Sequence, residues 1–170
     1  MAVTLRPVRE NDENFLLELY ASTRAEELAI TPWSPDQKQE FLRMQFDAQT
    51  RYYRQAFPEM DYRIVIHDGV PAGRFIVLRR EDELRLLDIS LLPEHRNAGI
   101  GNMLIQMLLD EAKGLDKAVR IHVERFNRAL RLYERLGFGP VADQGVYVLM
   151  EWNPKRRTDR VDEKLSDARI

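Results

Sequence analysis

Apolar and polar positions recur along the first third of the chain at two different spacings, which predict a strand followed by two helices. Apolar residues alternate with polar ones up to Pro7, as they do in a short strand. A helical spacing of apolar residues follows Asn11 or Asp12, either of which is a suitable helix cap. Ser34 begins a second helical pattern, with proline next and glutamine three residues after the serine. This second pattern lasts until Phe57.

The next part of the chain predicts three consecutive strands joined by short turns. The first covers residues 62–66 and the second residues 74–78. Asp68 and Gly69 lie between them, and both residue types tolerate the positive φ angles of a hairpin turn. The third strand is the apolar run at residues 86–92, which follows a polar turn.

The last third of the chain predicts one long helix, a strand, a short helix and two closing strands. The long helix begins near Gly101. Its apolar face is expected to carry Leu104, Met107, Leu108, Glu111 and Ala112. The later elements are expected at residues 118–123, 127–136, 138–141 and 146–152. The fold class is therefore α/β, of the mixed α+β kind, with a mostly antiparallel seven-stranded sheet and helices on both faces. One domain is expected at residues 1–152, followed by a charged, solvated tail at residues 153–170.

Composition narrows the class of protein. The chain has 170 residues, of which 44% are hydrophobic and 32% charged, and these values suit one well-solvated globular domain. The formal net charge of −2 argues against nucleic acid as the main partner. Without cysteine there is no disulfide, thiolate nucleophile or acetyl-cysteine step. No apolar run reaches the roughly 18–20 residues of a membrane span, and the first residues lack a signal-peptide core, so we expect a cytoplasmic protein with no membrane partner. No cluster has metal-ligand spacing, so no metal is predicted.

The apolar strand at residues 86–92 leads into a glycine-bearing loop and then a helix. Pro93 has no N–H and marks the end of strand pairing. Gly99 and Gly101 have no Cβ, so the backbone can turn sharply there and come close to a ligand. A helix that begins at such a loop presents free N–H groups and the positive end of its dipole, which suits a phosphate or pyrophosphate. A plain tight connection is the alternative, because neither a third glycine nor a Gly-Lys-Ser/Thr sequence follows.

A second segment changes the interpretation of this loop. Its pattern of asparagine, leucine–tyrosine and glycine–phenylalanine is formed by Asn127, Leu132, Tyr133, Gly137 and Phe138, and the motif's alanine falls one place early, at Ala129. The loop matches a second pattern, Arg/Gln-x-x-Gly-x-Gly/Ala, with Arg96, Gly99 and Gly101. Together the two motifs resemble those of the GCN5-related N-acetyltransferase superfamily, and the resemblance covers residues 84–152.

The resemblance implies an acyl-CoA N-acyltransferase fold with acetyl-CoA as co-substrate, whose acetyl group passes to a primary amine by direct attack in a ternary complex. The pyrophosphate is then expected over backbone N–H groups of the loop, and pantetheine along the edge of the preceding strand. A backbone N–H near Leu91 is expected to polarise the thioester carbonyl. The cofactor-binding residues implied in this way are Leu91, Leu92, Arg96, Asn97, Ala98, Gly99, Ile100, Gly101, Asn102 and Asn127.

The resemblance also implies that Tyr133 is the general acid that protonates the departing CoA thiolate. The alternative is a core aromatic, because Tyr133 shares one helical face with Leu132 and Leu136. Asn127 lies at the expected helix start, where it caps the helix, contacts the cofactor, or does both.

Two residues compete as the base that receives a proton from the amine. His122 lies on the strand before the second motif, where some family members have a glutamate base, and the ordinary imidazole pKa near 6.5 suits the task. Asp88 is flanked by apolar residues on the central strand, so its carboxylate must be paired or perturbed. The alternatives are that His122 faces solvent and that Asp88 pairs with a basic residue such as Arg85 or Arg120.

The acceptor pocket is expected in the helical segment at residues 23–60 together with the loop near Gln144. Aromatic candidates there are Trp33, Phe46, Tyr52, Tyr53 and Phe57, and acidic ones are Glu26, Glu27, Glu40, Asp47 and Glu59. Core aromatics and a solvated acidic face are the alternative. His95 is expected to face solvent, and His67 to be structural. The acceptor is a small-molecule or peptide amine of unknown identity, a homodimer is possible, and a non-catalytic acetyl-CoA sensor is the competing function.

Overall fold

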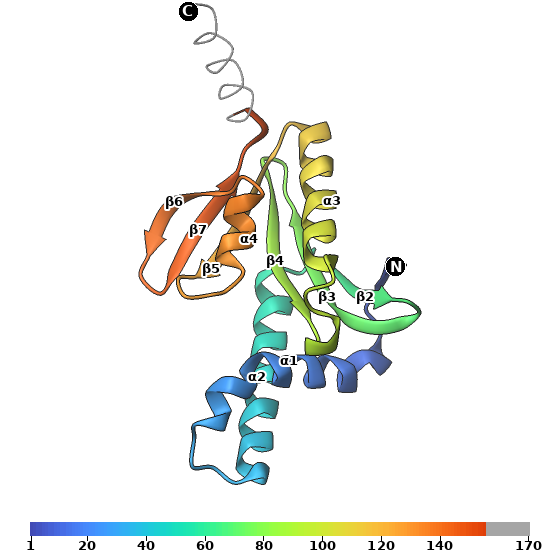
Figure 1. Cartoon of the computed structure of the whole chain (residues 1–170), viewed down its shortest axis with the longest axis vertical. Coiled ribbons are helices and arrows are strands. Elements are labelled where there is room, and N and C mark those ends of the chain that lie inside the picture. The colour runs from blue at the N-terminus through green and yellow to red at the C-terminus, as the bar shows by residue number, and fades with distance from the viewer. Residues whose placement is uncertain (156–170) are drawn as a thin grey trace, which may run out of the picture. The chain divides into compact units, whose positions relative to one another are not determined.

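In the computed structural model, which describes residues 1–155, seven strands form one sheet in the order β1-β2-β3-β4-β5-β7-β6 (Figure 1). The strands are β1 (Val3–Pro7), β2 (Asp61–His67), β3 (Val70–Arg79), β4 (Glu83–Leu91), β5 (Ala118–Glu124), β6 (Gly139–Gln144) and β7 (Tyr147–Trp152). The helices are η1 (Glu10–Asp12), α1 (Glu13–Ala29), α2 (Pro35–Ala56), η2 (Pro93–His95), α3 (Ile100–Leu115) and α4 (Leu130–Arg135).

The sheet is mixed and mostly antiparallel, as the sequence predicts. β4 and β5 pair in parallel, whereas β1 with β2, β2 with β3, β5 with β7 and β6 with β7 pair antiparallel. The parallel pair follows from the long crossover through α3, since parallel neighbours cannot be joined by a tight turn. The expected α/β fold class is therefore confirmed.

Contacts within the chain group its residues into two compact units. The first unit contains Met1–Leu78 and Asp88–Gly101. Within the described residues, the second contains Arg79–Leu87 and residues 102–155. The expected division into a domain at residues 1–152 and a tail stays a prediction, and residues 156–170 lie outside the part of the chain that the structure describes.

Local sequence rules account for the helices and the hairpin of the first unit. Ser34 caps α2 in a reciprocal box, since its hydroxyl accepts the Gln37 N–H at 3.2 Å while the Gln37 side chain accepts the Ser34 N–H at 2.9 Å. At the β2–β3 turn, Asp68 and Gly69 have φ angles of 48° and 86°, as a hairpin turn requires. α1 and α2 lie against each other (Figure 1), joined by the ring contact of Tyr20 with a phenylalanine of α2. The core of this layer is formed by Leu16, Leu19, Tyr20, Phe46, Ile64 and Leu92.

In the second unit the buried face of α3 differs from the predicted one. Met107 was expected on that face but is 50% exposed, and Glu111 lies near the surface in an ion pair with Arg79. After Ile100 at the start of the helix, the buried positions are Leu104, Ile105, Leu108, Leu109 and Ala112. They form adjacent pairs four residues apart, which make a broader and slightly rotated apolar stripe.

α4 is shorter than expected, running from Leu130 to Arg135 instead of residues 127–136. Gly137, with φ of 100°, ends it in a left-handed turn that favours glycine. Among residues 1–155 no helix is long and apolar enough to cross a membrane.

β3 approaches β4 closely at Gly73, which fixes the end of β4. A Cβ added to Gly73 would lie 2.1 Å from the carbonyl oxygen of Ser90 and 2.8 Å from a side-chain carbon of Leu91. Next to it, the Ala72 carbonyl accepts the Leu92 N–H at 2.8 Å. Only glycine allows this contact, because any side chain would push the two backbones apart.

Replacing Gly73 with alanine is expected to lower the free energy of unfolding by about 3 kcal/mol, because the new methyl group overlaps the backbone of β4. Gly114 of α3 is the matched control, since no heavy atom lies within 4 Å of a Cβ added there. Alanine at Gly114 is expected to be neutral or stabilising by up to about 1 kcal/mol. Urea unfolding of the three proteins makes the comparison, and equal stability of the two variants would show that β3 tolerates a side chain at this point.

Candidate active site

The loop between β4 and α3 has the geometry of an anion cradle. Asn97 and Gly99 both have positive φ, 60° and 81°, and α3 begins at Ile100. Left-handed residues next to a helix start turn successive N–H groups toward one concave side. No heavy atom lies within 4 Å of a Cβ added to Gly99, so glycine is needed there for its backbone angle and leaves the space above the loop open.

Arg96, the first residue of the loop motif, is tied back to the strand. Its Nε donates to the carbonyl oxygen of Leu91 at 2.9 Å. The 3₁₀ turn η2 bridges the two, with the His95 N–H donating to Leu92 at 2.9 Å and the Arg96 N–H to Pro93 at 3.2 Å. The side chain of Arg96 therefore ties the loop to the end of β4, while the residue remains exposed.

The backbone of β4 also offers a donor at this end. The Leu92 N–H points to β3, where Ala72 accepts it. Backbone groups of successive strand residues point to opposite edges, so the N–H of Leu91 points away from β3. On that edge the parallel ladder with β5 runs only from Glu83 to Leu86. The Leu91 N–H therefore lies on a stretch of strand edge that is suited to an extended ligand.

Asp88 lies in a partly buried polar cluster of the first unit. Its Oδ2 accepts from the Arg74 Nε at 2.5 Å and from the Ser90 hydroxyl at 3.0 Å. The alternative that Asp88 pairs with a basic residue is confirmed, but the partner is Arg74 of β3, which is only 6% exposed, instead of Arg85 or Arg120. A carboxylate on β4 is therefore compensated by the strand beside it, as a buried charge must be.

The remaining nitrogens of Arg74 are satisfied by residues that sequence reasoning did not connect with the site. Nη1 donates to the Tyr62 hydroxyl at 3.1 Å and Nη2 to the Gln49 side chain at 3.0 Å. Burial opposes the charged form of Arg74, but Asp88 and Tyr62 raise its pKa above the ordinary value overall. Burial and the nearby Asp88 carboxylate raise the pKa of Tyr53 on α2 to about 12, so that this hydroxyl stays protonated.

In the second unit, His122 is exposed and its ring meets Arg85. The Arg85 Nη1 lies 3.2 Å from the His122 Nδ1. A guanidinium only donates, so Nδ1 must accept and the neutral ring carries its proton on Nε2. Partial burial and the Arg85 charge lower the pKa of His122, while Gln144 and Glu83 oppose the shift. Arg120, which was considered as a partner for Asp88, pairs instead with Glu83 at 2.7 Å and Glu151 at 2.9 Å.

Tyr133 and Asn127 belong to the second motif. Tyr133 is 4% exposed, and its ring packs edge-on against Phe138 with centroids 5.6 Å apart. Asn127 lies before α4, where its side-chain oxygen accepts the Ala129 N–H at 2.8 Å. It therefore caps the turn that leads into the short helix, two residues before the helix N-cap Ala129.

Comparison with known proteins identifies the family of this chain. A family model described as "Acetyltransferase (GNAT) family" matches residues 23–138, about two thirds of the chain. The chain belongs to the GNAT acetyltransferase family. It is an N-acetyltransferase that uses acetyl-CoA, and this assignment favours the enzyme over the sensor. No curated protein matches the chain.

Solved structures share the fold of this GNAT protein. A PaiA N-acetyltransferase from Thermoplasma acidophilum, in complex with coenzyme A, is 20% identical, with 90% of this chain and 99% of that chain covered and a TM-score of 0.67. Spermidine N-acetyltransferase from Vibrio cholerae, in complex with CoA and spermine, is 19% identical over 90% and 96%, with a TM-score of 0.60. Ribosomal-protein-S18-alanine N-acetyltransferase from Escherichia coli is 20% identical over 89% and 94%, with a TM-score of 0.58.

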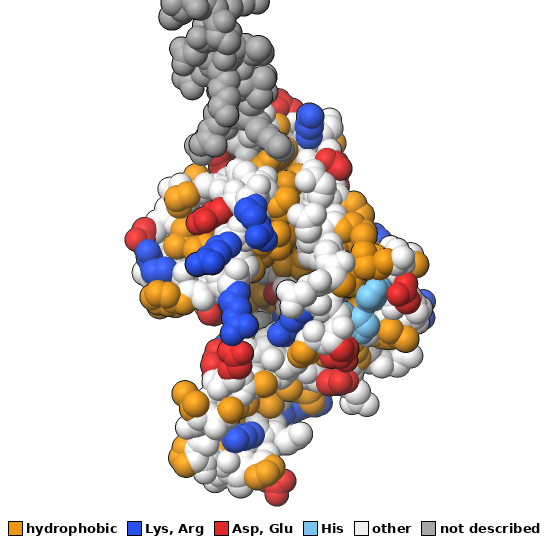
Figure 2. All heavy atoms as spheres, in the orientation of Figure 1, with side chains coloured by type: hydrophobic (Ala, Val, Ile, Leu, Met, Phe, Trp, Pro, Cys, Tyr) orange, Lys and Arg blue, Asp and Glu red, His pale blue; other side chains and the backbone are white. Residues whose placement is uncertain are grey.

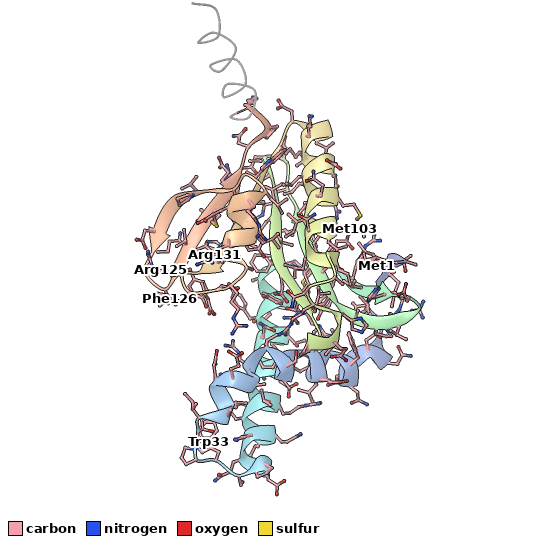
Figure 3. All side chains as sticks on the ribbon, viewed as in Figure 1. Met1, Trp33, Met103, Arg125, Phe126 and Arg131 are labelled. Carbon is pink, nitrogen blue, oxygen red and sulfur yellow. The ribbon has the colours of Figure 1, made fainter. Side chains whose placement is uncertain are left out.

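Of the aromatic residues of this GNAT protein that were expected near the acceptor, Phe46 belongs to the core, whereas Trp33 lies beside a surface hollow. Phe46 is buried in the core, so it does not face a cleft. Trp33 packs edge-on against Phe41, with centroids 4.9 Å apart, and is labelled in Figure 3. A shallow hollow of about 270 Å³ is lined there by Trp33, Gln37, Glu40, Phe41 and Met44.

The loop between β5 and α4 carries exposed residues that are not among the predicted site residues. Arg125 and Phe126 of this loop, and Arg131 of the helix α4 that follows it, are labelled in Figure 3, and Phe126 is 94% exposed. Arg125 is held by Asp143 at 2.5 Å, which ties the loop to β6. The sequence feature that could have pointed to these exposed residues is an aromatic residue among arginines, immediately before and within the second motif.

Arg74→Met is expected to lower the free energy of unfolding by about 4 kcal/mol, because it leaves the Asp88 carboxylate partly buried without its cation. Arg43→Met is the control, since Arg43 pairs with Glu13 at 2.7 Å on the surface. The loss there is expected to be below about 1 kcal/mol. Denaturant unfolding measures both, and a loss for Arg74→Met as small as that for Arg43→Met would contradict the buried-pair interpretation.

Proposed function

We propose that this enzyme acetylates a primary amine by direct attack within a ternary complex, with the reaction centred on the free edge of β4. The observation that carries the proposal is the succession of a backbone donor at Leu91, a carboxylate at Asp88 and an anion cradle at residues 96–101 along one short stretch. Bound acetyl-CoA supplies an acetyl thioester, and its reaction with an amine gives an acetamide and CoA.

The cradle is suited to holding the pyrophosphate of acetyl-CoA. Asn97 and Gly99 turn backbone N–H groups to one side, and the first turn of α3 adds the free N–H groups of a helix start. Arg96, the first residue of the cradle, contributes positive charge. The remaining members, Ala98, Ile100, Gly101 and Asn102, act through their backbone. Leu92 fixes the strand end by its hydrogen bond to Ala72.

The Leu91 N–H is the proposed donor to the thioester carbonyl oxygen. It points to the edge of β4 along which β5 no longer pairs. A donor fixed by a strand backbone needs no reorganisation as negative charge develops on that oxygen, which is why such donors contribute strongly to acyl transfer.

Asp88 is the proposed binding group for the amine and the first receiver of its proton. Within the described residues its hydrogen bonds use only Oδ2, for Arg74 and Ser90, so the lone pairs of Oδ1 are available to an ammonium or amine. His122 is less suited as a base, because Arg85 already uses the single lone pair of its neutral ring. An anionic receptor also favours an acceptor that carries positive charge.

Tyr133 is the proposed acid that returns a proton to the CoA thiolate. Its ring is fixed by burial against Phe138, which limits the positions that the hydroxyl can take. Asn127 is proposed to touch the cofactor only through the turn that it caps. The acceptor is either a small-molecule amine or a peptide amine, as with the spermidine and alanine N-acetyltransferases of the same fold. A homodimer stays a prediction.

Gly99→Ala is expected to weaken CoA binding by about tenfold, because alanine at φ of 81° strains the loop and turns its N–H groups away. Gly145→Ala is the matched control: its φ is 79°, and it too has open space around an added Cβ. Both changes cost about 1 kcal/mol of stability, so only the binding differs. Calorimetric titration with CoA gives the affinities, and equal weakening in both variants would argue against a CoA cradle at Gly99.

Tyr133→Phe is expected to lower kcat by about 100-fold or more, because it removes the proposed proton donor. CoA affinity should remain unchanged, since the hydroxyl acts on the leaving group. Thiol release from acetyl-CoA with a panel of primary alkylamines, diamines and peptide N-termini identifies an acceptor first and then gives kcat. A variant that turns over at the wild-type rate would mean that Tyr133 is a core aromatic.

A further inference from the structure

Two histidines that the sequence leaves without a shared role are in direct contact in the first unit. The Nδ1 atoms of His67 and His95 lie 2.8 Å apart, with the rings nearly perpendicular. Figure 2 shows pale-blue histidine atoms together on the face in view. His95 was expected to face solvent, and this prediction was wrong, because its ring is half-buried against His67. The side chain of His67 is itself only 15% exposed.

This contact needs a definite number of protons. A hydrogen bond between two Nδ1 atoms requires one N–H and one lone pair. Two neutral rings satisfy it, and so does one neutral ring facing one imidazolium. Two imidazolium rings do not, because both Nδ1 atoms then carry hydrogen and both rings carry positive charge. The second proton therefore breaks the contact.

Charged groups around the pair set which ring donates. The His67 Nε2 lies 3.4 Å from an Asp68 carboxylate oxygen, which favours hydrogen on that nitrogen. When His67 is neutral, its Nδ1 then accepts from His95. The N–H of Ala2 holds the pKa of Asp68 below its ordinary value, so this carboxylate stays charged, and the N-terminal ammonium lies nearby. Glu94 and Arg96 flank His95 along its own turn.

The contact joins a rigid strand to the start of the CoA cradle. His67 is the last residue of β2, paired with Val3 on one side and Val70 on the other. His95 ends η2 and is followed directly by Arg96. Among residues 1–155, the hydrogen bond to His67 is the one that the His95 side chain makes. When it breaks, η2 loses its side-chain anchor to the sheet.

We propose that His95 is a positioning residue for the CoA cradle, which it holds in place through His67 until both rings are protonated. The inference rests on the proposed role of residues 96–101 in binding CoA. In the anchored state the His67–His95 contact is intact, and in the released state it is broken. The released state holds one more proton, and CoA binds the anchored state better. By linkage, CoA affinity falls as the pH falls, and CoA binding at low pH expels a proton.

The test compares CoA binding at about pH 7.5 and about pH 5.5, where imidazoles gain protons. Calorimetry in two buffers of different ionisation enthalpy gives both the affinity and the protons released. The proteins are the wild type, His95→Asn, His95→Ala and Glu94→Gln. Asparagine places an amide near the position of Nδ1 and can donate or accept without titrating. Glu94→Gln changes a neighbouring titratable group and leaves the histidine contact intact.

The wild type and Glu94→Gln are expected to lose about tenfold more affinity than His95→Asn between the two pH values. At the lower pH they should release up to about one proton more than His95→Asn on binding CoA. His95→Ala should bind CoA several-fold more weakly than His95→Asn at both pH values. The phosphates of CoA titrate equally in every measurement, so the differences between proteins belong to His95.

Equal pH dependence and equal proton release in the wild type and His95→Asn would overturn the inference while leaving the cradle intact. If the folded wild type binds no CoA even at about pH 7.5, the proposed cradle itself is wrong. Circular dichroism at both pH values separates a loss of binding from a loss of fold.

Discussion

The contact between β3 and β4 at Gly73 is the constraint on which the rest of the site depends. Because Gly73 has no side chain, the two backbones meet closely at Ser90 and Leu91. The adjacent bond from Leu92 to Ala72 then fixes which way each backbone group of β4 points. The direction of the Leu91 N–H and the starting point of the loop both follow. A displaced β4 would misdirect the donor and the cradle together.

The negative charge of a partly buried carboxylate on β4 requires a cation whose own hydrogen bonds are satisfied, and three other elements of the first unit provide these groups. Arg74 of β3 forms an ion pair with Asp88, while Tyr62 of β2 and Gln49 of α2 accept hydrogen bonds from the remaining guanidinium nitrogens. A partly satisfied buried cluster would cost more than an apolar core. Among the described residues, the hydrogen bonds of this cluster leave the Oδ1 atom of Asp88 unused. The same interactions that stabilise the fold therefore orient the proposed amine receptor.

Features set by neighbouring residues could be predicted from the sequence, and features set by strand register could not. The capping box at Ser34 and the hairpin turn at Asp68 depend on a few adjacent residues, and both were predicted correctly. The loop at Gly99 was predicted as a sharp turn for the same reason. The partner of Asp88 lies fourteen residues away on a neighbouring strand, and only the β3–β4 register brings Arg74 to it. Met107 was misplaced because helical spacing alone does not say which of two neighbouring stripes faces inward.

The three histidines differ in the group that occupies the single nitrogen lone pair of the neutral ring. A neutral imidazole has one nitrogen lone pair, and at His122 a permanent cation uses it. That ring gains little by acting as a base, because it would have to displace Arg85 first. At His67 and His95 the lone pair of one Nδ1 meets the N–H of the other, a contact that two imidazolium rings cannot make. Among the described residues, hydrogen bonds to the Asp88 carboxylate use only Oδ2, which is why the proposed proton transfer is assigned to Asp88 and the proposed pH response to the pair of His67 and His95.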